Sequence, residues 1–183
     1  MIAGGEIAAA DALGPAGLGV LGTASGVKAV RSAEEVNAAM KARGWSPAWS
    51  PGTPVIETTL QPGTRVNMIV DAKTAQAIAD GRFEKIVPGG WATFDDVETV
   101  AADVRQRAAI TTQFKKSVDG KFYVVEMEVM QPLNSSVGFV GAQKEVTGGL
   151  LQGGGTQVHF DETIKGKDRW NFFKPSSSPK LLN

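Results

Sequence analysis

Apolar side chains first recur at helical spacing over residues 32–43, in the stretch S-A-E-E-V-N-A-A-M-K-A-R. Ser32 is a favoured helix N-cap, and Glu35, three positions later, completes a capping box with it. Gly44 follows as a typical stop signal. The pattern therefore predicts a helix over residues 32–43.

Beyond this helix, short runs rich in β-branched residues predict strands. They cover residues 55–60, 64–70, 122–130, 137–143 and 156–160. A second helix is predicted over residues 71–81, with Asp71 as its cap and Gly81 as its stop. A third is predicted over residues 95–110, because acidic residues come first and arginines last, as the helix dipole favours.

The remaining segments are expected to be irregular. Residues 44–54, G-W-S-P-A-W-S-P-G-T-P, carry two Trp and three Pro, so we expect an extended arm that packs its aromatic rings on the domain. Residues 82–93 are expected to form a strand and a turn. The tail from Pro175 is expected to be loose.

These elements predict an α+β fold, in which a small central antiparallel or mixed β-sheet carries a few helices. We expect residues 1–44 to form a Gly/Ala-rich leader and helix, and residues 45–183 to form the main domain. The favoured interpretation of the leader is a flexible or weakly helical segment. The alternative is a segment that helps the protein to cross a membrane, suggested by the spacing of its glycines.

Composition removes several kinds of site. The 19 basic and 19 acidic side chains give a formal net charge of zero, whereas nucleic-acid-binding proteins usually show a basic excess. The absence of Cys excludes disulfides, thiol chemistry and a Cys/His zinc site. With one His in the chain, a His-rich catalytic zinc site is not expected either, so no metal is implied.

Residues 148–160, G-G-L-L-Q-G-G-G-T-Q-V-H-F, hold five glycines and the only His of the chain. Neither a P-loop nor a Rossmann glycine pattern is present. On pattern alone, a glycine-rich loop that enters a strand is favoured. The functional alternative is a loop that brings the backbone close to a ligand, with Gln157 and His159 together on one face of the strand.

Other side chains allow a structural and a functional interpretation. Arginine guanidinium groups suit phosphate, but they also solvate surfaces; these are Arg65, Arg105 and Arg107. Trp91 and Phe94 could stack on a base, although core packing is the usual role of aromatic rings. Glu126 and Glu128 share one strand face, either as solvated groups or as carboxylates at a sugar.

The order of five short motifs is more informative than any single one. They are G-G-W-A-T-F-D-D-V, V-R-Q-R-A-A-I, F-Y-V-V-E-M-E-V, S-S-V-G-F-V-G-A-Q and Q-G-G-G-T-Q-V. This order resembles the C-terminal toxin domains of polymorphic and contact-dependent growth inhibition proteins, and the tuberculosis-necrotizing-toxin class of NAD glycohydrolases. The resemblance covers about residues 33–160. The chain departs from that pattern at A-A-I-T after Arg107, which lacks the family Pro, and by an inserted K-E-V-T-G-G-L-L.

The resemblance implies an antibacterial toxin domain, secreted as part of a larger effector, which hydrolyses NAD(P)+ to nicotinamide and ADP-ribose in the target-cell cytoplasm. NAD+ is then the substrate, no cofactor is needed, and a cognate immunity protein is the expected partner. The residues implied as catalytic are Gln157, Arg65 and Arg107, with Arg105 as the alternative to Arg107. The surface expected to bind substrate comprises Arg105, Trp91, Phe94, Phe139, Gly154, Gly155 and His159.

Two other activities stay open. An RNase toxin would use His159 with Lys115, Lys116 or Arg107, although the neutral net charge argues against a stable nucleic-acid complex. An ADP-ribosyltransferase or cyclase would use the same NAD pocket, with Glu126 or Glu128 as the positioning carboxylate. Transient membrane passage by the N-terminal segment belongs to the same delivery hypothesis.

Overall fold

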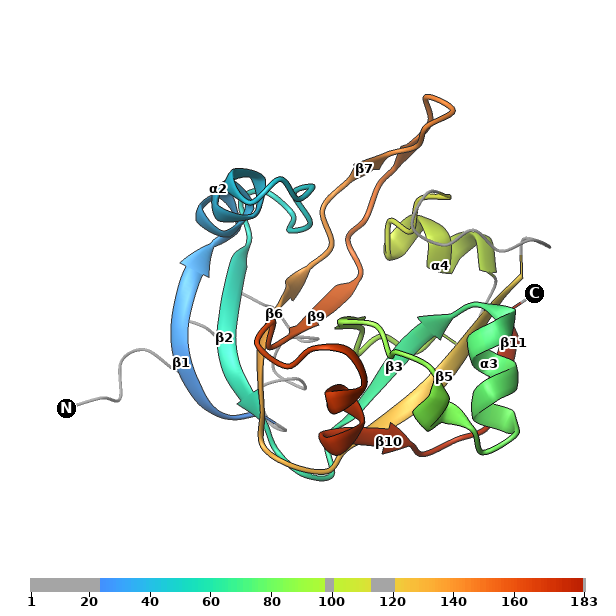
Figure 1. Cartoon of the computed structure of the whole chain (residues 1–183). Coiled ribbons are helices and arrows are strands. Elements are labelled where there is room, and N and C mark those ends of the chain that lie inside the picture. Colours follow the sequence, from blue (N-terminus) through green and yellow to red (C-terminus); the bar gives the residue numbers. More distant parts are fainter. Residues whose placement is uncertain (1–23, 98–100, 113–120, 183) are drawn as a thin grey trace.

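The computed structural model describes residues 24–97, 101–112 and 121–182 (Figure 1). It confirms the α+β class, with antiparallel pairing between all of the named strands. One sheet has five strands in the order β1-β2-β6-β9-β4. Their bounds are Ala24–Ser32, Pro54–Leu60, Leu133–Phe139, Thr156–Phe160 and Trp91–Ala92.

The second sheet is built around β5, Phe122–Val129. Strand β3, Arg65–Val70, pairs with β5, and the two short strands β10, Phe173–Pro175, and β11, Lys180–Leu182, also pair with it. A separate hairpin of β7, Gln143–Lys144, and β8, Leu150–Leu151, projects from the body beside α4 in Figure 1.

Helices α2 and α3 begin and end close to where the sequence signals place them, whereas the third helix is shorter than predicted. Residues 95–97, its expected first turn, are irregular because the Asp95 side chain is hydrogen-bonded to Thr156 on β9. Helix α2, Ala33–Ala42, has the predicted capping box between Ser32 and Glu35. Helix α3, Ala72–Ala79, is capped by Asp71, whose side chain accepts a hydrogen bond from the Thr74 N–H at 2.8 Å. Helix α4 covers Ala101–Arg107, and two 3₁₀ helices cover Phe83–Lys85 and Gly166–Asn171.

The main core lies between the two large sheets. It takes apolar side chains from β3, β5, β6, β9, β10 and α3. Successive side chains of a strand point to opposite faces of the sheet. On β9, Val158 and Phe160 therefore point into the core, while Gln157 and His159 lie on the opposite face. That division of β9 is the one that the sequence predicts.

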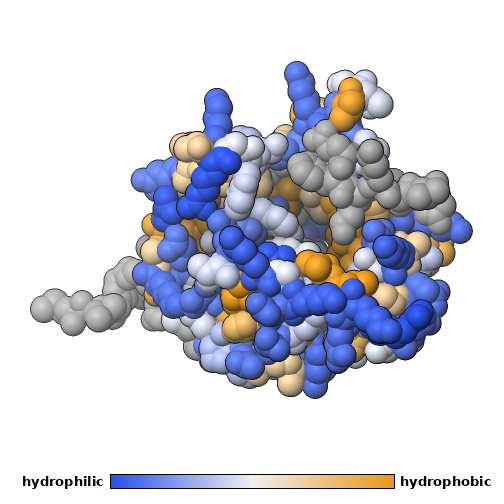
Figure 2. Space-filling model, in the orientation of Figure 1, coloured by the Kyte–Doolittle hydropathy of each residue, from blue (hydrophilic) through white to orange (hydrophobic). Residues whose placement is uncertain are grey.

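The predicted arm is present, but only one of its two Trp rings packs on the domain, since Trp45 is 43% exposed. Trp49 is 1% exposed and packs with Ala33, Met40 and Val55 on the outer face of the five-stranded sheet. The side chain of Asn37 holds the arm in place: its amide nitrogen donates to the Trp49 carbonyl at 2.7 Å, and its oxygen accepts from the Trp49 N–H at 3.0 Å. The face of the molecule seen in Figure 2 is largely hydrophilic, with smaller apolar patches between the polar side chains.

Two segments at the ends of the chain differ from expectation. Residues 24–32 form strand β1 and not a flexible or weakly helical leader, because their backbone pairs along β2 from Ser32↔Pro54 to Ala24↔Leu60. The tail is not loose, since β10 and β11 supply hydrogen-bond partners to β5. Residues 1–23, which hold the glycine-spaced part of the leader, lie outside the described residues.

The C-terminal strand contributes to the core through one leucine. Leu182 is 5% exposed and packs with Phe122 and Val124, whereas the neighbouring Leu181 is 43% exposed. Leu182→Ala is expected to lower the free energy of unfolding by about 2 kcal/mol, because it leaves a cavity. Leu181→Ala is the matched control and should change it by less than about 0.5 kcal/mol. Urea unfolding followed by Trp fluorescence measures both, and equal midpoints for the two variants would contradict the prediction.

Candidate active site

The triple glycine joins the end of helix α4 to the end of strand β6. Gly153 N–H donates to the Gln106 carbonyl at 2.9 Å, and Gly155 N–H donates to the Arg107 carbonyl at 3.0 Å. Gly154 N–H donates to the Val140 carbonyl at 2.8 Å. The last carbonyls of a helix have no partner within the helix, so this loop satisfies two of them from outside. The glycines therefore fix the helix turn that carries Arg107.

Two of these positions require glycine for different reasons. Gly153 has a φ of +75°, and a Cβ there would lie 2.4 Å from the Val140 carbonyl oxygen. Gly155 is required because there is no room for a side chain, since a Cβ would lie 2.8 Å from Asp95 Oδ2. The favoured interpretation of the sequence, a glycine-rich loop entering a strand, agrees with the start of β9 at Thr156. The loop also approaches a carboxylate of its own chain.

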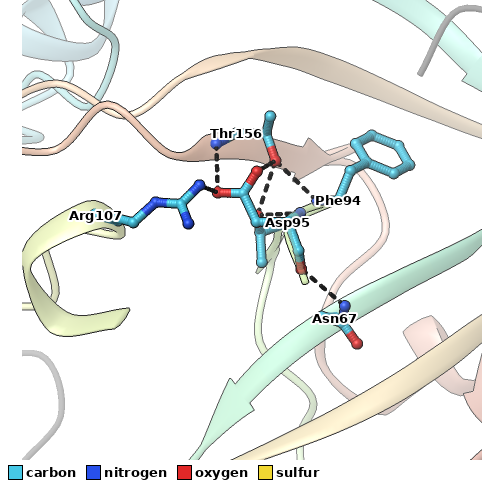
Figure 3. Close-up of polar contacts among 6 residues, drawn as sticks. Asn67, Phe94, Asp95, Arg107 and Thr156 are labelled. Carbon is cyan, nitrogen blue, oxygen red and sulfur yellow. Dashed lines mark hydrogen bonds and ion pairs between the residues drawn. The ribbon is translucent and has the colours of Figure 1, made fainter. Parts of the chain in front are cut away.

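That carboxylate, Asp95, organises the polar cluster in Figure 3. Arg107 Nη2 donates to Asp95 Oδ2 at 2.9 Å. The Thr156 N–H donates to the same oxygen at 3.1 Å, and the Thr156 hydroxyl donates to Asp95 Oδ1 at 2.8 Å. Sequence reasoning placed Asp95 in the first turn of a helix and did not identify it as a site residue. No sequence signal identifies Asp95, because the close approach of Gly155 to its carboxylate is visible only in the structure.

A small cavity of about 20 Å³ lies beside this cluster and is large enough for about one water molecule. Its lining includes Arg107 and the three acidic residues Asp95, Asp96 and Asp103. The Arg107 side chain is 56% exposed, so its guanidinium reaches solvent at this place. The site thus presents a fixed cation next to several anions, an arrangement that suits a ligand carrying both signs of charge.

Gln157 and His159 lie on the other face of β9 and contact the aromatic arm. Gln157 is 9% exposed, and its amide nitrogen donates to the Ala48 carbonyl at 3.2 Å. The His159 ring stacks on Trp91 with centroids 3.9 Å apart, and Trp91 contacts Trp49 at 5.8 Å. This face therefore joins the predicted residues Trp91, Gln157 and His159 to one another but not to Arg107.

His159 is held as a neutral imidazole. Burial, and then the positive charges of Arg169 and Arg43, lower its pKa to about 4. Its Nδ1 lies 3.8 Å from a Glu162 carboxylate oxygen, which is too long for a hydrogen bond. A groove of about 380 Å³ opens beside it, between α2 and the sheet, and ion pairs Arg31–Glu57 and Arg43–Glu162 occupy its rim.

The other predicted arginines have structural partners. Arg65 on β3 pairs with Glu126 at 3.1 Å on the second sheet. Arg105 donates to the Ile110 carbonyl at 2.7 Å, lies 3.7 Å from Glu145, and packs over the Phe122 ring at 4.5 Å. The structure therefore does not bring Arg65, Arg107 and Gln157 into one pocket.

The remaining predicted contact residues divide between the site and the core. The Phe94 N–H donates to the Thr156 hydroxyl at 3.0 Å, which places this residue next to Arg107, while its ring packs against the main core. Phe139 packs against Ile56. Gly154 and Gly155 belong to the loop that holds α4. Of the expected substrate surface, Phe94, Gly154 and Gly155 thus lie around Arg107.

The alternative activities use residues that the structure places apart. Lys115 and Lys116 lie outside the described residues. Glu126 accepts hydrogen bonds from Arg65 and from Ser176, at 2.7 Å from the latter, and does not line the Arg107 cavity. Within the described ranges, no group of three or more His, Asp or Glu side chains could hold a metal ion. No helix among the described residues is long and apolar enough to cross a membrane.

Comparison with known proteins gives one informative likeness. The fold is similar to that of Tne2, solved in complex with Tni2, with a TM-score of 0.57 and 26% sequence identity. The match covers 74% of this chain and 98% of Tne2, so the two proteins share almost the whole of the smaller fold. The sequence matches no protein-family model, and a search of curated proteins found no significant match.

Gly155 is predicted to be the most sensitive glycine for the geometry of the cluster. Gly155→Ala places a methyl group against Asp95 and is expected to cost about 1–3 kcal/mol of stability through overpacking. Gly149→Ala is the control, because its Cβ would meet only the Glu145 Cβ at 3.9 Å. Thermal and urea unfolding of both variants tests this, and a Gly155→Ala protein as stable as the control would contradict it.

The buried His159 predicts a pH dependence of stability. Because its pKa falls from 6.5 to about 4 on folding, the unfolded chain binds more protons between these values, and acidification destabilises the fold. From pH 7 to pH 5 the wild type should lose roughly 2 kcal/mol more than His159→Gln, which lacks the titrating group. Urea unfolding at both pH values measures the difference, and parallel losses in the two proteins would rule out a titrating His159.

Proposed function

We propose that this chain is an antibacterial toxin domain that hydrolyses NAD(P)+ to nicotinamide and ADP-ribose. Two observations support the toxin class. The order of the sequence motifs resembles polymorphic toxins, and the fold resembles that of Tne2 over 98% of that chain. Tne2 was solved with Tni2, a pairing of the kind that a toxin forms with its immunity protein. A cognate immunity protein is accordingly the partner we propose here.

The chemistry of NAD+ cleavage fits the charges of the Arg107 cluster. NAD+ joins an anionic pyrophosphate to a cationic nicotinamide riboside, and the bond that breaks develops oxocarbenium character on the ribose. A guanidinium binds the pyrophosphate, and carboxylates stabilise positive charge that develops nearby. Arg107 supplies the guanidinium, and Asp96 and Asp103, which line the same cavity, supply the carboxylates.

This reaction also makes few demands on acid–base groups. Nicotinamide leaves without a proton donor, and water attacks an electrophilic carbon, so no strong general base is required. That agrees with a chain whose single imidazole, His159, stacks on Trp91 on the opposite face of β9 from the Arg107 cluster. The observation that carries the proposal is the placement of Arg107, exposed at the end of α4 and held there by Asp95 and the glycine loop.

The other residues implied by the resemblance contribute only if they exchange a present partner for substrate. Gln157 would release the Ala48 carbonyl, and Arg65 would release Glu126. Delivery as part of a larger secreted effector, with action in the cytoplasm of the target cell, completes the proposal. The segment linked to delivery in this proposal is the Gly/Ala-rich leader and helix over residues 1–44.

Arg107 provides the direct test of the activity. Purified protein is incubated with NAD+ or NADP+ and the release of nicotinamide is measured. Arg107→Ala is expected to lower kcat/KM by about 10²-fold, the scale for loss of one preorganised charged contact. The matched control is Arg43→Ala, because Arg43 has a similarly exposed side chain and an equivalent ion pair with Glu162. It should retain wild-type turnover.

Two outcomes would overturn the proposal. Absence of nicotinamide release at high protein concentration, without immunity protein, would exclude NAD hydrolysis. Degraded tRNA or rRNA in intoxicated cells with intact NAD(P)+ would favour the RNase alternative instead. Labelled ADP-ribose on an acceptor protein, without free ADP-ribose, would favour a transferase.

A further inference from the structure

The Arg107 cluster contains more hydrogen bonds than are needed to hold one exposed guanidinium. We infer that Asp95 is the positioning residue for Arg107 and that the hydroxyl groups of Thr156 and Thr93 fix its carboxylate. This inference rests on the proposed function, because it assigns Arg107 to the phosphates of the substrate. Nothing in the sequence motifs singles out Asp95, so the inference depends on the geometry alone.

Both carboxylate oxygens of Asp95 are engaged from the same residue. The Thr156 backbone N–H donates to Oδ2 at 3.1 Å and the Thr156 hydroxyl donates to Oδ1 at 2.8 Å. Two contacts to one neighbour fix the plane of the carboxylate, and its side chain is only 16% exposed. Arg107 Nη2 then meets Oδ2 in a defined direction at 2.9 Å.

The hydroxyl protons have a single consistent arrangement. A hydroxyl donates one proton, and a carboxylate only accepts, so the proton of Thr156 is committed to Asp95. In the 2.9 Å contact between the two threonine hydroxyls, Thr93 must therefore be the donor. Thr93 in turn accepts from the Asp95 N–H at 3.0 Å, which closes a ring of hydrogen bonds that starts and ends at Asp95.

The cluster is also tied to both large sheets. The side-chain amide of Asn67 on β3 donates to the Asp95 carbonyl at 2.9 Å. The backbones of Asn67 and Thr93 exchange two hydrogen bonds, of 2.8 and 2.9 Å, at the bridge between the sheets. Asp95 therefore holds its carboxylate in a place defined by β3, β4 and β9 together.

This arrangement orients the Arg107 guanidinium and leaves it exposed to solvent. Only Nη2 contacts Asp95, and more than half of the side chain is exposed, so the other guanidinium N–H groups remain available for a bidentate phosphate contact. A free arginine side chain would pay rotamer entropy when it binds phosphate. Asp95 removes part of that cost before the substrate arrives.

A double-mutant cycle separates positioning from simple support of the fold. Asp95→Asn is expected to raise KM for NAD+ about tenfold and to change kcat by less than about twofold, since the lost interaction organises binding. In an Arg107→Ala background the same change should lower kcat/KM by less than about twofold, because the group it positions is gone. The control is Glu162→Gln, which removes the carboxylate from the Arg43 ion pair and should leave turnover at the wild-type level.

The threonine hydroxyl gives a second, conservative test. Thr156→Val removes the donor to Asp95 and should raise KM in the same direction as Asp95→Asn. Thr156→Ser keeps the hydroxyl and should restore most of the binding that Thr156→Val loses. The positioning role would be overturned if Asp95→Asn lowered kcat/KM by the same factor in the wild type and in Arg107→Ala. A fall in kcat with KM unchanged would also overturn it.

A readout that needs no turnover keeps this inference separate from the proposed function. The NMR signal of the Arg107 side-chain N–H should be protected from solvent exchange in the wild type and lose that protection in Asp95→Asn. The signal of Arg43 should not change in the same variant. Protection of Arg107 that survives Asp95→Asn would overturn the inference. Wild-type protein that shows this NMR effect but releases no nicotinamide would overturn the proposed reaction alone.

Discussion

The hydrogen bonds from the glycine loop to the end of helix α4 are the constraint on which the candidate site depends. A helix terminus exposes carbonyls that need partners, and here Gly153 and Gly155 supply them from a loop far away in the sequence. Only residues without a side chain can bring the backbone this close, because a Cβ at Gly155 would meet Asp95. The short helix that carries Arg107 is thereby attached to the start of β9.

Because the loop is attached in this way, the two faces of strand β9 make different contacts. Thr156 turns toward Asp95 and Arg107, where the exposed charges lie. Gln157 and His159 turn toward Trp49 and Trp91, where the contacts are aromatic and largely buried. The exposed cation therefore sits on one face of the sheet, and the only imidazole lies on the other, neutral near pH 7 because its pKa is about 4.

Local sequence signals accounted for most of the elements. The capping box at Ser32 and Glu35, the Asp71 cap and the strand at residues 156–160 all appear in the structure as predicted. Each depends on interactions within a few residues along the chain, which the sequence displays directly. Residues 24–32, the first half of β6 and the strands after Phe172 escaped prediction, and all of them are ordered by pairing with distant strands.

The sequence by itself determined the α+β class, the boundaries of α2 and α3, the inward and outward faces of β9 and the importance of the glycine stretch. Only the tertiary structure decided which side chains meet. It placed Arg65 with Glu126, Gln157 with the Ala48 carbonyl and Arg107 with Asp95. Local patterns record periodicity and backbone preference, but they do not record which segments pack together. The assembly of a site from β3, β4, α4 and β9 is set by long-range strand pairing and by the space that glycine leaves.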